Sequence, residues 1–296
     1  MKELVLTISP DMAERSVQSL LEGELRVSAT LVRRLKRRER GITLNGQPIF
    51  TTARVRTGDV LRADVSDDVS LRPAPKEAAF GVLYEDEDII IIDKPAGMAA
   101  HASTRDPDMP TAEGALAFYL PPDVVPHPVS RLDRGTSGAM TFAKSGYAHE
   151  LLRRQLHTAD FYKEYLAICV GTPDPPAGLV DAPTGYAEGS RYKRAVTENG
   201  APSVSEYETL QTKKGLSLVR LVPHTGRMHQ LRVHMAYIGC PLLGDWLYGE
   251  EAPALIARPA LHAAYVRVKQ PLTGEVVEVR APMIEDMGMA WAQIHR

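Results

Sequence analysis

The chain has 296 residues, of which 44% are hydrophobic and 24% are charged, and its formal net charge is −2. This composition is ordinary for a globular protein with one large domain or two unequal ones. Cys169 and Cys240 lie far apart and form no C-x-x-C pair, which argues against a disulfide framework and against a thiolate zinc site. No stretch approaches about 18 consecutive apolar residues, so we expect a cytoplasmic protein without a membrane segment.

Positive charge is concentrated near the start of the chain. Residues 1–66 contain 12 Lys and Arg against 8 Asp and Glu, a net charge of +4, and the remainder carries 23 against 29, a net charge of −6. Ser28 is a candidate N-cap for a short helix whose leucines repeat at helical spacing and whose arginines face outward. Arg33, Arg34 and Arg37 are therefore candidate phosphate contacts, and a merely solvated helix face is the alternative.

The segment after this helix contains the hairpin signal Asn45-Gly46 and then Gly58-Asp59-Val60-Leu61. The order of basic helix, L-N-G turn and G-D-x-L strand resembles the alpha-L RNA-binding domain of a small-subunit ribosomal protein, which is appended to many RNA-modifying enzymes. The resemblance implies an RNA-binding domain over residues 1–66. Residues 67–79 include two prolines and little apolar periodicity, which indicates a linker before a second domain at 80–296.

Strand patterns joined by short turns dominate this second domain. The run Ile89-Ile90-Ile91-Ile92 predicts a buried strand, and a helix is predicted over 147–156. Further strands are predicted at 138–144, 161–170, 203–211, 216–222, 261–269 and 275–280. The hairpin connections predict an α+β fold, with a mixed, largely antiparallel sheet and flanking helices.

One aspartate stands between two arginines in the segment Val129-Ser130-Arg131-Leu132-Asp133-Arg134-Gly135-Thr136-Ser137-Gly138. The flanking cations favour an ionised carboxylate, so Asp133 is a candidate nucleophile or base rather than a proton donor. The small residues after it predict a turn into the next strand. The segment has neither the spacing of a phosphate-binding loop nor the G-x-S-x-G context of a serine nucleophile.

A second polar cluster covers residues 223–235 and predicts a helix that opens after a turn and packs on the sheet. Arg232 starts from the packed face of this helix, so it needs a carboxylate partner, and we expect a bidentate pair with Asp133. His229 and His234 are five positions apart. They diverge by roughly 140° around a helix, which argues against a zinc pair.

Five ordered blocks of the sequence form one pattern. They are Ile92-Asp93-Lys94-Pro95-Ala96-Gly97 with the downstream His101, Arg131 to Gly138, Lys163-Glu164-Tyr165-Leu166-Ala167, Thr225 to Met235, and Gly239 to Gly249. In these blocks the chain resembles the RluA-type pseudouridine synthases. One residue departs from the family pattern: His usually precedes the Arg-Leu-Asp, whereas this chain has Ser130, and we expect altered loop packing or RNA contact rather than lost chemistry.

The resemblance implies that residues 80–296 are a catalytic domain that isomerises uridine to pseudouridine in ribosomal or transfer RNA, without a cofactor or metal. The N1–C1′ bond breaks and the base rejoins through C5. Asp133 is then the catalytic carboxylate, which either attacks C1′ or removes the C2′ proton. Tyr165 stacks on the base and can assist C5 deprotonation, Arg232 holds Asp133, and Arg131 replaces the flipped nucleotide in the stack.

Other cations are candidates for RNA contact. Lys193 lies in the segment 190–195, near the place where the family has an RNA-clasping loop, and Arg227 lies in the second polar cluster. Without the resemblance, Tyr165 would be read as a core tyrosine and Arg131 and Arg227 as surface cations. We expect a monomer with RNA as its partner. The alternative function is a catalytically silent RNA-binding or ribosome-assembly factor.

Overall fold

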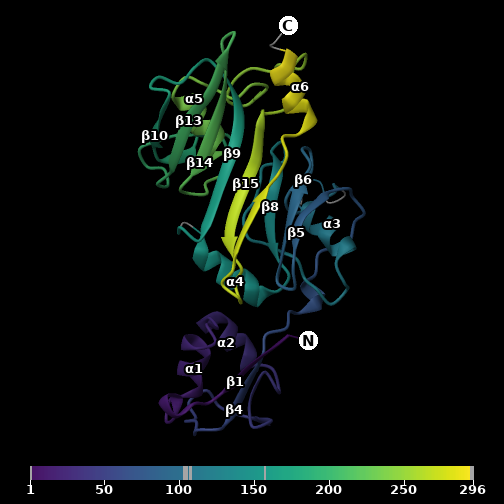
Figure 1. Cartoon of the computed structure of the whole chain (residues 1–296), viewed down its shortest axis with the longest axis vertical. Coiled ribbons are helices and arrows are strands. Elements are labelled where there is room, and N and C mark those ends of the chain that lie inside the picture. The colour runs from purple at the N-terminus through teal and green to yellow at the C-terminus, as the bar shows by residue number, and fades with distance from the viewer. Residues whose placement is uncertain (1, 103–105, 107–108, 157, 294–296) are drawn as a thin grey trace.

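The computed structural model describes residues 2–102, 106, 109–156 and 158–293, which form a smaller and a larger part (Figure 1). The smaller part contains a four-stranded antiparallel sheet in the order β1-β4-β2-β3 with two helices against it. Its elements are β1 (Glu3–Thr7), the 3-10 turn η1 (Pro10–Met12), α1 (Val17–Gly23), α2 (Ala29–Leu35), β2 (Ile42–Leu44), β3 (Gln47–Pro48) and β4 (Val60–Asp64).

Local signals explain the elements of the smaller part. Ser28 caps α2 because its hydroxyl accepts a hydrogen bond from the Leu31 N–H at 3.1 Å. Asn45 and Gly46 have φ values of 52° and 77°, which is the left-handed conformation that a tight hairpin between β2 and β3 requires. The predicted basic helix and hairpin are therefore confirmed.

The larger part follows the 3-10 turn η2 (Val69–Leu71). Its helices are α3 (Ala112–Tyr119), α4 (Gly146–Gln155), α5 (Gln230–Tyr237) and α6 (Glu285–Gln293). Its strands are β5 (Gly81–Glu85), β6 (Ile89–Lys94), β7 (His127–Pro128), β8 (Ser137–Ala143), β9 (Phe161–Val170), β10 (Ala177–Asp181), β11 (Thr184–Tyr186), β12 (Arg194–Val196), β13 (Val204–Lys213), β14 (Leu216–Pro223), β15 (Leu261–Lys269) and β16 (Val276–Arg280). Across the described residues, no helix is long and apolar enough to cross a membrane.

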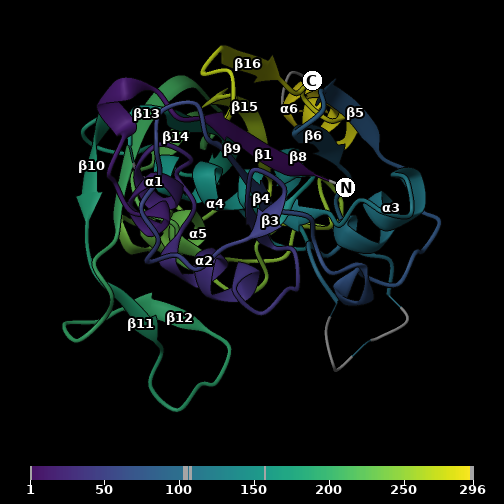
Figure 2. The ribbon, with the colours of Figure 1, turned by 90° about the horizontal axis from the view of Figure 1, so that it is seen from below.

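Ten of these strands form one sheet in the order β10-β13-β14-β9-β15-β8-β6-β5, with β16 beside β15 and β7 beside β8. Only β8 and β15 pair in parallel among the described strands, which confirms the predicted mixed, largely antiparallel sheet. Strand β9 matches its prediction residue for residue, and α4 begins and ends one residue earlier than predicted. The β11–β12 hairpin, which was not predicted, projects away from the body of the molecule (Figure 2).

Helix α4 lies between the two parts of the molecule (Figure 1). Tyr147 and Leu151 extend from this helix into the hydrophobic core of the smaller part. The Tyr147 hydroxyl donates to the Leu25 carbonyl at 2.7 Å, and the Ser28 hydroxyl donates to the Glu150 carboxylate at 2.5 Å. The two parts are therefore joined by a packed and hydrogen-bonded interface.

Residues of the expected linker also make specific contacts. The Asp67 carboxylate accepts from the Gly146 N–H at 2.8 Å, at the start of α4, and lies 3.0 Å from His127 Nε2. The Arg72 guanidinium donates to the backbone carbonyls of Ala117, Leu120, Pro121 and Val124. These contacts fix the path of the connecting chain over the larger part.

Candidate active site

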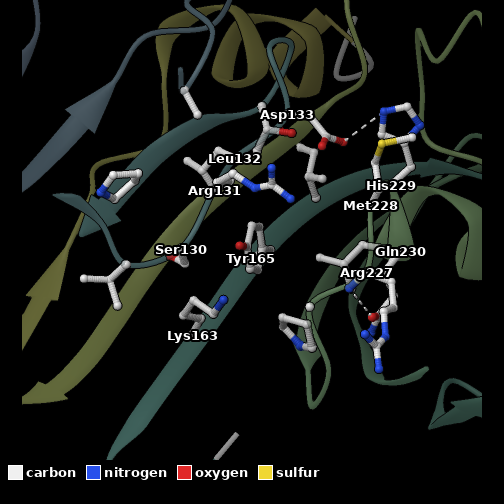
Figure 3. Close-up of a pocket in the computed structure, with 18 of the residues that line it drawn as sticks. Ser130, Arg131, Leu132, Asp133, Lys163, Tyr165, Arg227, Met228, His229 and Gln230 are labelled. Carbon is white, nitrogen blue, oxygen red and sulfur yellow. Dashed lines mark hydrogen bonds and ion pairs between the residues drawn. The ribbon is translucent and has the colours of Figure 1, made fainter. Parts of the chain in front are cut away.

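The predicted catalytic residues meet in a pocket of about 850 Å³ (Figure 3). Asp133 comes from the loop before β8, Tyr165 from β9 and Arg232 from α5. The sequence separates these residues by many positions, so their meeting depends on the register of the sheet and on the placement of α5.

Strand register brings the Asp133 loop next to Tyr165. Ala263 of β15 pairs with Gly138 on one side and with Tyr165 on the other. Gly138 has a φ of 105°, and a Cβ there would lie 2.3 Å from the Ala263 carbonyl oxygen. Only glycine allows this close approach, so Gly138 lets the chain turn from the Asp133 loop directly into β8.

The buried side chain of Lys94 supports the loop that contains Asp133. Lys94 is fully buried and donates to the Met98 carbonyl at 2.8 Å and to the Pro95 carbonyl at 2.9 Å. The Gly97 N–H donates to the Arg134 carbonyl at 2.8 Å, which ties this turn to the residue after Asp133. Burial lowers the pKa of Lys94 to about 8. The block 92–97 therefore shapes the Asp133 loop.

Arg232 contacts two carboxylates with different geometry. Its guanidinium forms a bidentate pair with Asp245, with Nε and Nη2 each 2.7 Å from a carboxylate oxygen, whereas Nη1 lies 3.5 Å from Asp133 Oδ2. The predicted contact with Asp133 is present, but the prediction of a bidentate pair was wrong. Burial disfavours the charge of Arg232, yet the hydrogen bonds to Asp245 outweigh this cost and raise its pKa.

The nitrogen groups next to Asp133 come from α5 and the residue before it, not from its neighbours in sequence. His229 Nε2 lies 3.9 Å from Asp133 Oδ2 (Figure 3), in addition to the Arg232 contact. Arg134 donates instead to the Gly97 carbonyl at 3.1 Å. Arg131 is exposed and has no hydrogen bond or ion pair among the described residues. Among the described residues, neither flanking arginine therefore forms an ion pair with Asp133.

The backbone conformation at His229 directs its side chain toward Asp133. His229 has a φ of 57° and directly precedes α5, which begins at Gln230 rather than straight after the turn as predicted. The Tyr248 hydroxyl accepts from the Arg194 N–H at 3.0 Å and lies 2.8 Å from His229 Nδ1. When the Tyr248 hydroxyl donates to Nδ1, the neutral imidazole carries its proton on Nε2, toward Asp133. Burial lowers the pKa of His229, which favours the neutral ring.

Tyr165 and Lys163 lie on the same face of β9 (Figure 3) because they are two positions apart. Burial, with a contribution from Asp133, raises the pKa of Tyr165, so the phenol stays protonated at neutral pH. Lys163 lines the pocket without an ion pair among the described residues, and burial lowers its pKa to about 8. Lys163 was not predicted as a site residue, although strand alternation places it beside Tyr165.

The candidate RNA contacts divide into two groups. Arg131 and Arg227 line the pocket, and Lys193 of the 190–195 segment lies 5.8 Å from the ring centre of Tyr248. Arg33, Arg34 and Arg37 belong to the smaller part, on or just after α2, and are not part of this pocket. Ser130 also lines the pocket (Figure 3).

Comparison with known proteins agrees with this geometry. A family model described as RNA pseudouridylate synthase matches residues 88–237, which include Asp133, Tyr165 and Arg232. The chain is 34% identical over 272 residues to the uncharacterized RNA pseudouridine synthase YjbO of Bacillus subtilis, covering 90% of this chain and 94% of that protein. It is 34% identical over 260 residues to ribosomal large subunit pseudouridine synthase D of Xanthomonas campestris, covering 82% and 78%. The chain belongs to the RNA pseudouridine synthase family.

A solved structure supports the same assignment. Human RNA pseudouridylate synthase domain containing 1 superposes with a TM-score of 0.58 at 27% identity, over 69% of this chain and 83% of that one. The resemblance to the RluA-type enzymes is therefore confirmed, and the protein is an isomerase that acts on uridine in RNA. The similarity of the first 66 residues to an alpha-L domain stays a prediction.

Proposed function

We propose that this enzyme isomerises specific uridines of ribosomal or transfer RNA to pseudouridine, with Asp133 as its catalytic carboxylate. The observation that carries the proposal is the position of this carboxylate in the pocket, where it faces Arg232 Nη1 at 3.5 Å and His229 Nε2 at 3.9 Å. The Arg232 guanidinium donates to this carboxylate, and His229 lies beside it. Relatives named as large-subunit ribosomal pseudouridine synthases favour ribosomal RNA as the substrate.

Asp133 has two routes to glycosidic cleavage. Its carboxylate either attacks C1′, which forms a covalent ester, or removes the C2′ proton, which gives a glycal. In both routes the electron pair of the N1–C1′ bond leaves with the base, and the base turns. C5 then bonds to C1′, either as the C1′–O bond of the ester breaks and frees Asp133, or as Asp133 returns its proton to C2′ of the glycal. The C5 proton departs to solvent, and N1 takes up a proton. Both routes begin with an ionised carboxylate, so Arg232 and His229 serve either one.

We assign Tyr165 to stacking on the target base. Its phenol is held protonated by burial, which favours a stacking and hydrogen-bonding role over that of an ionised base. The pocket is lined by the loop at 131–134, β9 and the loop before α5, among other segments. A uridine must leave its stack to enter such a site, and the exposed Arg131 at the rim is suited to fill its place.

We further propose the domain organisation that the sequence predicts. Residues 1–66 form an RNA-binding domain of the alpha-L type, 67–79 connect it, and 80–296 are the catalytic domain. The separate sheet of the smaller part and the outward arginines of α2 support this division. RNA contacts would come from Arg33, Arg34 and Arg37 in the first domain and from Arg131, Lys193 and Arg227 in the second.

The test uses the purified wild-type protein and total RNA from cells that lack its gene. We expect new pseudouridines at defined positions, detected by chemical mapping of ribosomal and transfer RNA. Wild-type protein that binds these RNAs but forms no pseudouridine would favour the silent RNA-binding or assembly factor instead.

A further inference from the structure

A second groove, of about 520 Å³, lies between α2 and α4. His149 and Arg153 of α4 line both this groove and the active pocket. Arg34 of α2 lines the opposite wall. One face of α4 therefore leads from the pocket that contains Asp133 to the basic helix of the smaller part.

Arg153 is the free cation on this path. It is exposed, and among the described residues it has no hydrogen bond or ion pair. Arg154, the next residue on the same helix, is also exposed but pairs with Glu150 at 2.8 Å and lines neither cavity. Two adjacent arginines thus differ in direction and in partner.

The other charged groups of the groove leave its net charge positive. Both oxygens of the Glu150 carboxylate are engaged, one by Ser28 and one by Arg154. His127 lies 3.0 Å from Asp67, which does not line the groove and is 3.9 Å from Arg34. His149 is neutral because burial lowers its pKa to about 4.

The groove also has a fixed width. Tyr147 and Leu151 of α4 are buried in the core of the smaller part, so α2 cannot move away without exposing them. The distance from the α2 arginines to Asp133 is therefore set by packing rather than by a loose tether. A chain that bridged them would meet a preformed basic track.

We propose that the RNA backbone beside the target uridine runs along α4, with its phosphates contacted by Arg153 and Arg34. The proposal rests on the proposed function, because it assumes that the uridine enters the Asp133 pocket. A phosphodiester fits the observations because the donors along the track are guanidinium groups, which suit phosphate, and because the track opens directly into the pocket.

The test compares Arg153→Gln with Arg154→Gln, a matched control on the same helix. Binding to an unmodified transcript of large-subunit ribosomal RNA is measured against salt concentration. For Arg153→Gln we expect the slope of log affinity against log salt to fall by about 0.7–0.9, with affinity reduced roughly five- to eightfold at 0.1 M salt. We expect Arg34→Gln to reduce the slope and the affinity by similar amounts. Arg154→Gln should leave the slope unchanged.

Pseudouridine formation on the same transcript separates this proposal from the proposed function. The expected pattern is a raised KM and an unchanged kcat for Arg153→Gln. A slope for Arg153→Gln equal to wild type, or an equal reduction for Arg154→Gln, overturns the α4 path whether or not the enzyme is active. Wild-type protein that forms no pseudouridine refutes the proposed function, and the salt slopes still decide whether RNA contacts Arg153.

Discussion

Asp133 depends on residues that are remote in sequence, and Arg232 is the clearest case. Its bidentate partner Asp245 is fully buried, whereas its contact with Asp133 is longer and the Asp133 side chain is 28% exposed. A buried arginine requires a carboxylate, and the sequence predicts that much, but it offers 37 Asp and Glu as candidates. The fold places residues 239–249 behind α5, and only this placement makes Asp245 the partner of Arg232.

The first prediction contrasts these two carboxylates. Asp245→Asn leaves the buried charge of Arg232 without its counter-ion and should lower the free energy of unfolding by about 3–5 kcal/mol. Asp133→Asn, at a partly exposed position, should change stability by less than about 1 kcal/mol. Denaturant unfolding of both variants measures the difference. Equal stabilities would show that the Asp245 pair does not hold Arg232.

Lys163 gives the site a pH dependence. Burial lowers its folded-state pKa to about 8 from an ordinary 10.5, so its charge is present below pH 8 and disappears above it. If this ammonium contacts the RNA backbone, KM should rise as pH increases through 8. Lys163→Arg keeps its charge throughout this range and should remove the rise. The KM–pH profile checks this, and identical profiles for both proteins would exclude Lys163 from RNA contact.

The same shift has a consequence for stability. The unfolded chain binds a proton at Lys163 up to about pH 10.5, whereas the folded chain releases it near pH 8. Between these values the unfolded state holds more protons, so this group makes the free energy of unfolding rise with pH. Lys163→Arg should lack this contribution.

At the scale of elements, α4 has two apolar stripes that serve different parts of the molecule. Tyr147 and Leu151 face the smaller part, whereas Ala148 and Leu152, one position along the helix, pack on the large sheet. The prediction of the helix from its periodicity was confirmed. Its role between two cores was not predicted, although two adjacent stripes on one helix are a signal for it.

Two leucines of α4 test this division. Leu151→Ala should lower the free energy of unfolding by about 2–5 kcal/mol. It should chiefly accelerate amide hydrogen exchange within residues 1–66. Leu152→Ala should cost a similar amount but accelerate exchange in β6 and β8. Mass spectrometry of exchanged peptides distinguishes the two patterns. Uniform exchange changes in both variants would mean that α4 does not divide its packing in this way.

The sequence predicted strands better than the short helices. Strand β9 and the hairpins around β13–β14 and β15–β16 carry apolar runs separated by clear turn signals. Helices α1, α3 and α6 were missed because they are short and α3 is apolar on nearly every side. The β11–β12 hairpin was missed because its strands have three residues each.

On the scale of the whole molecule, charge is divided between the two parts. The net charge of +4 over residues 1–66, against −6 over the remainder, favours binding of RNA through the smaller part. The packed interface at Tyr147 joins the two parts, so their exposed faces form one continuous surface. We therefore expect RNA affinity to depend on the smaller part even when the target uridine occupies the pocket of the larger one.

Charge reversal at Arg33 and Arg34 of α2 and at Arg37 just after it tests this expectation. Substituting Glu at Arg33, Arg34 and Arg37 should weaken RNA binding and flatten its salt dependence by about 0.7–0.9 log units for each phosphate that the variant no longer binds. Reversal at Arg15, Arg54 and Arg62 is the control, because these arginines lie in the same part of the chain outside α2. If the α2 variant had the same salt dependence of RNA affinity as wild type, this helix would face solvent rather than RNA.

The central claim is that the Asp133 carboxylate acts in cleavage of the N1–C1′ bond, in a site where Arg232 and His229 position this carboxylate. The most direct measurement is single-turnover pseudouridine formation by Asp133→Asn beside wild type, with RNA affinity measured on the same samples. We predict unchanged affinity and no detectable pseudouridine for the variant. Pseudouridine formed by Asp133→Asn at the wild-type rate would contradict this claim.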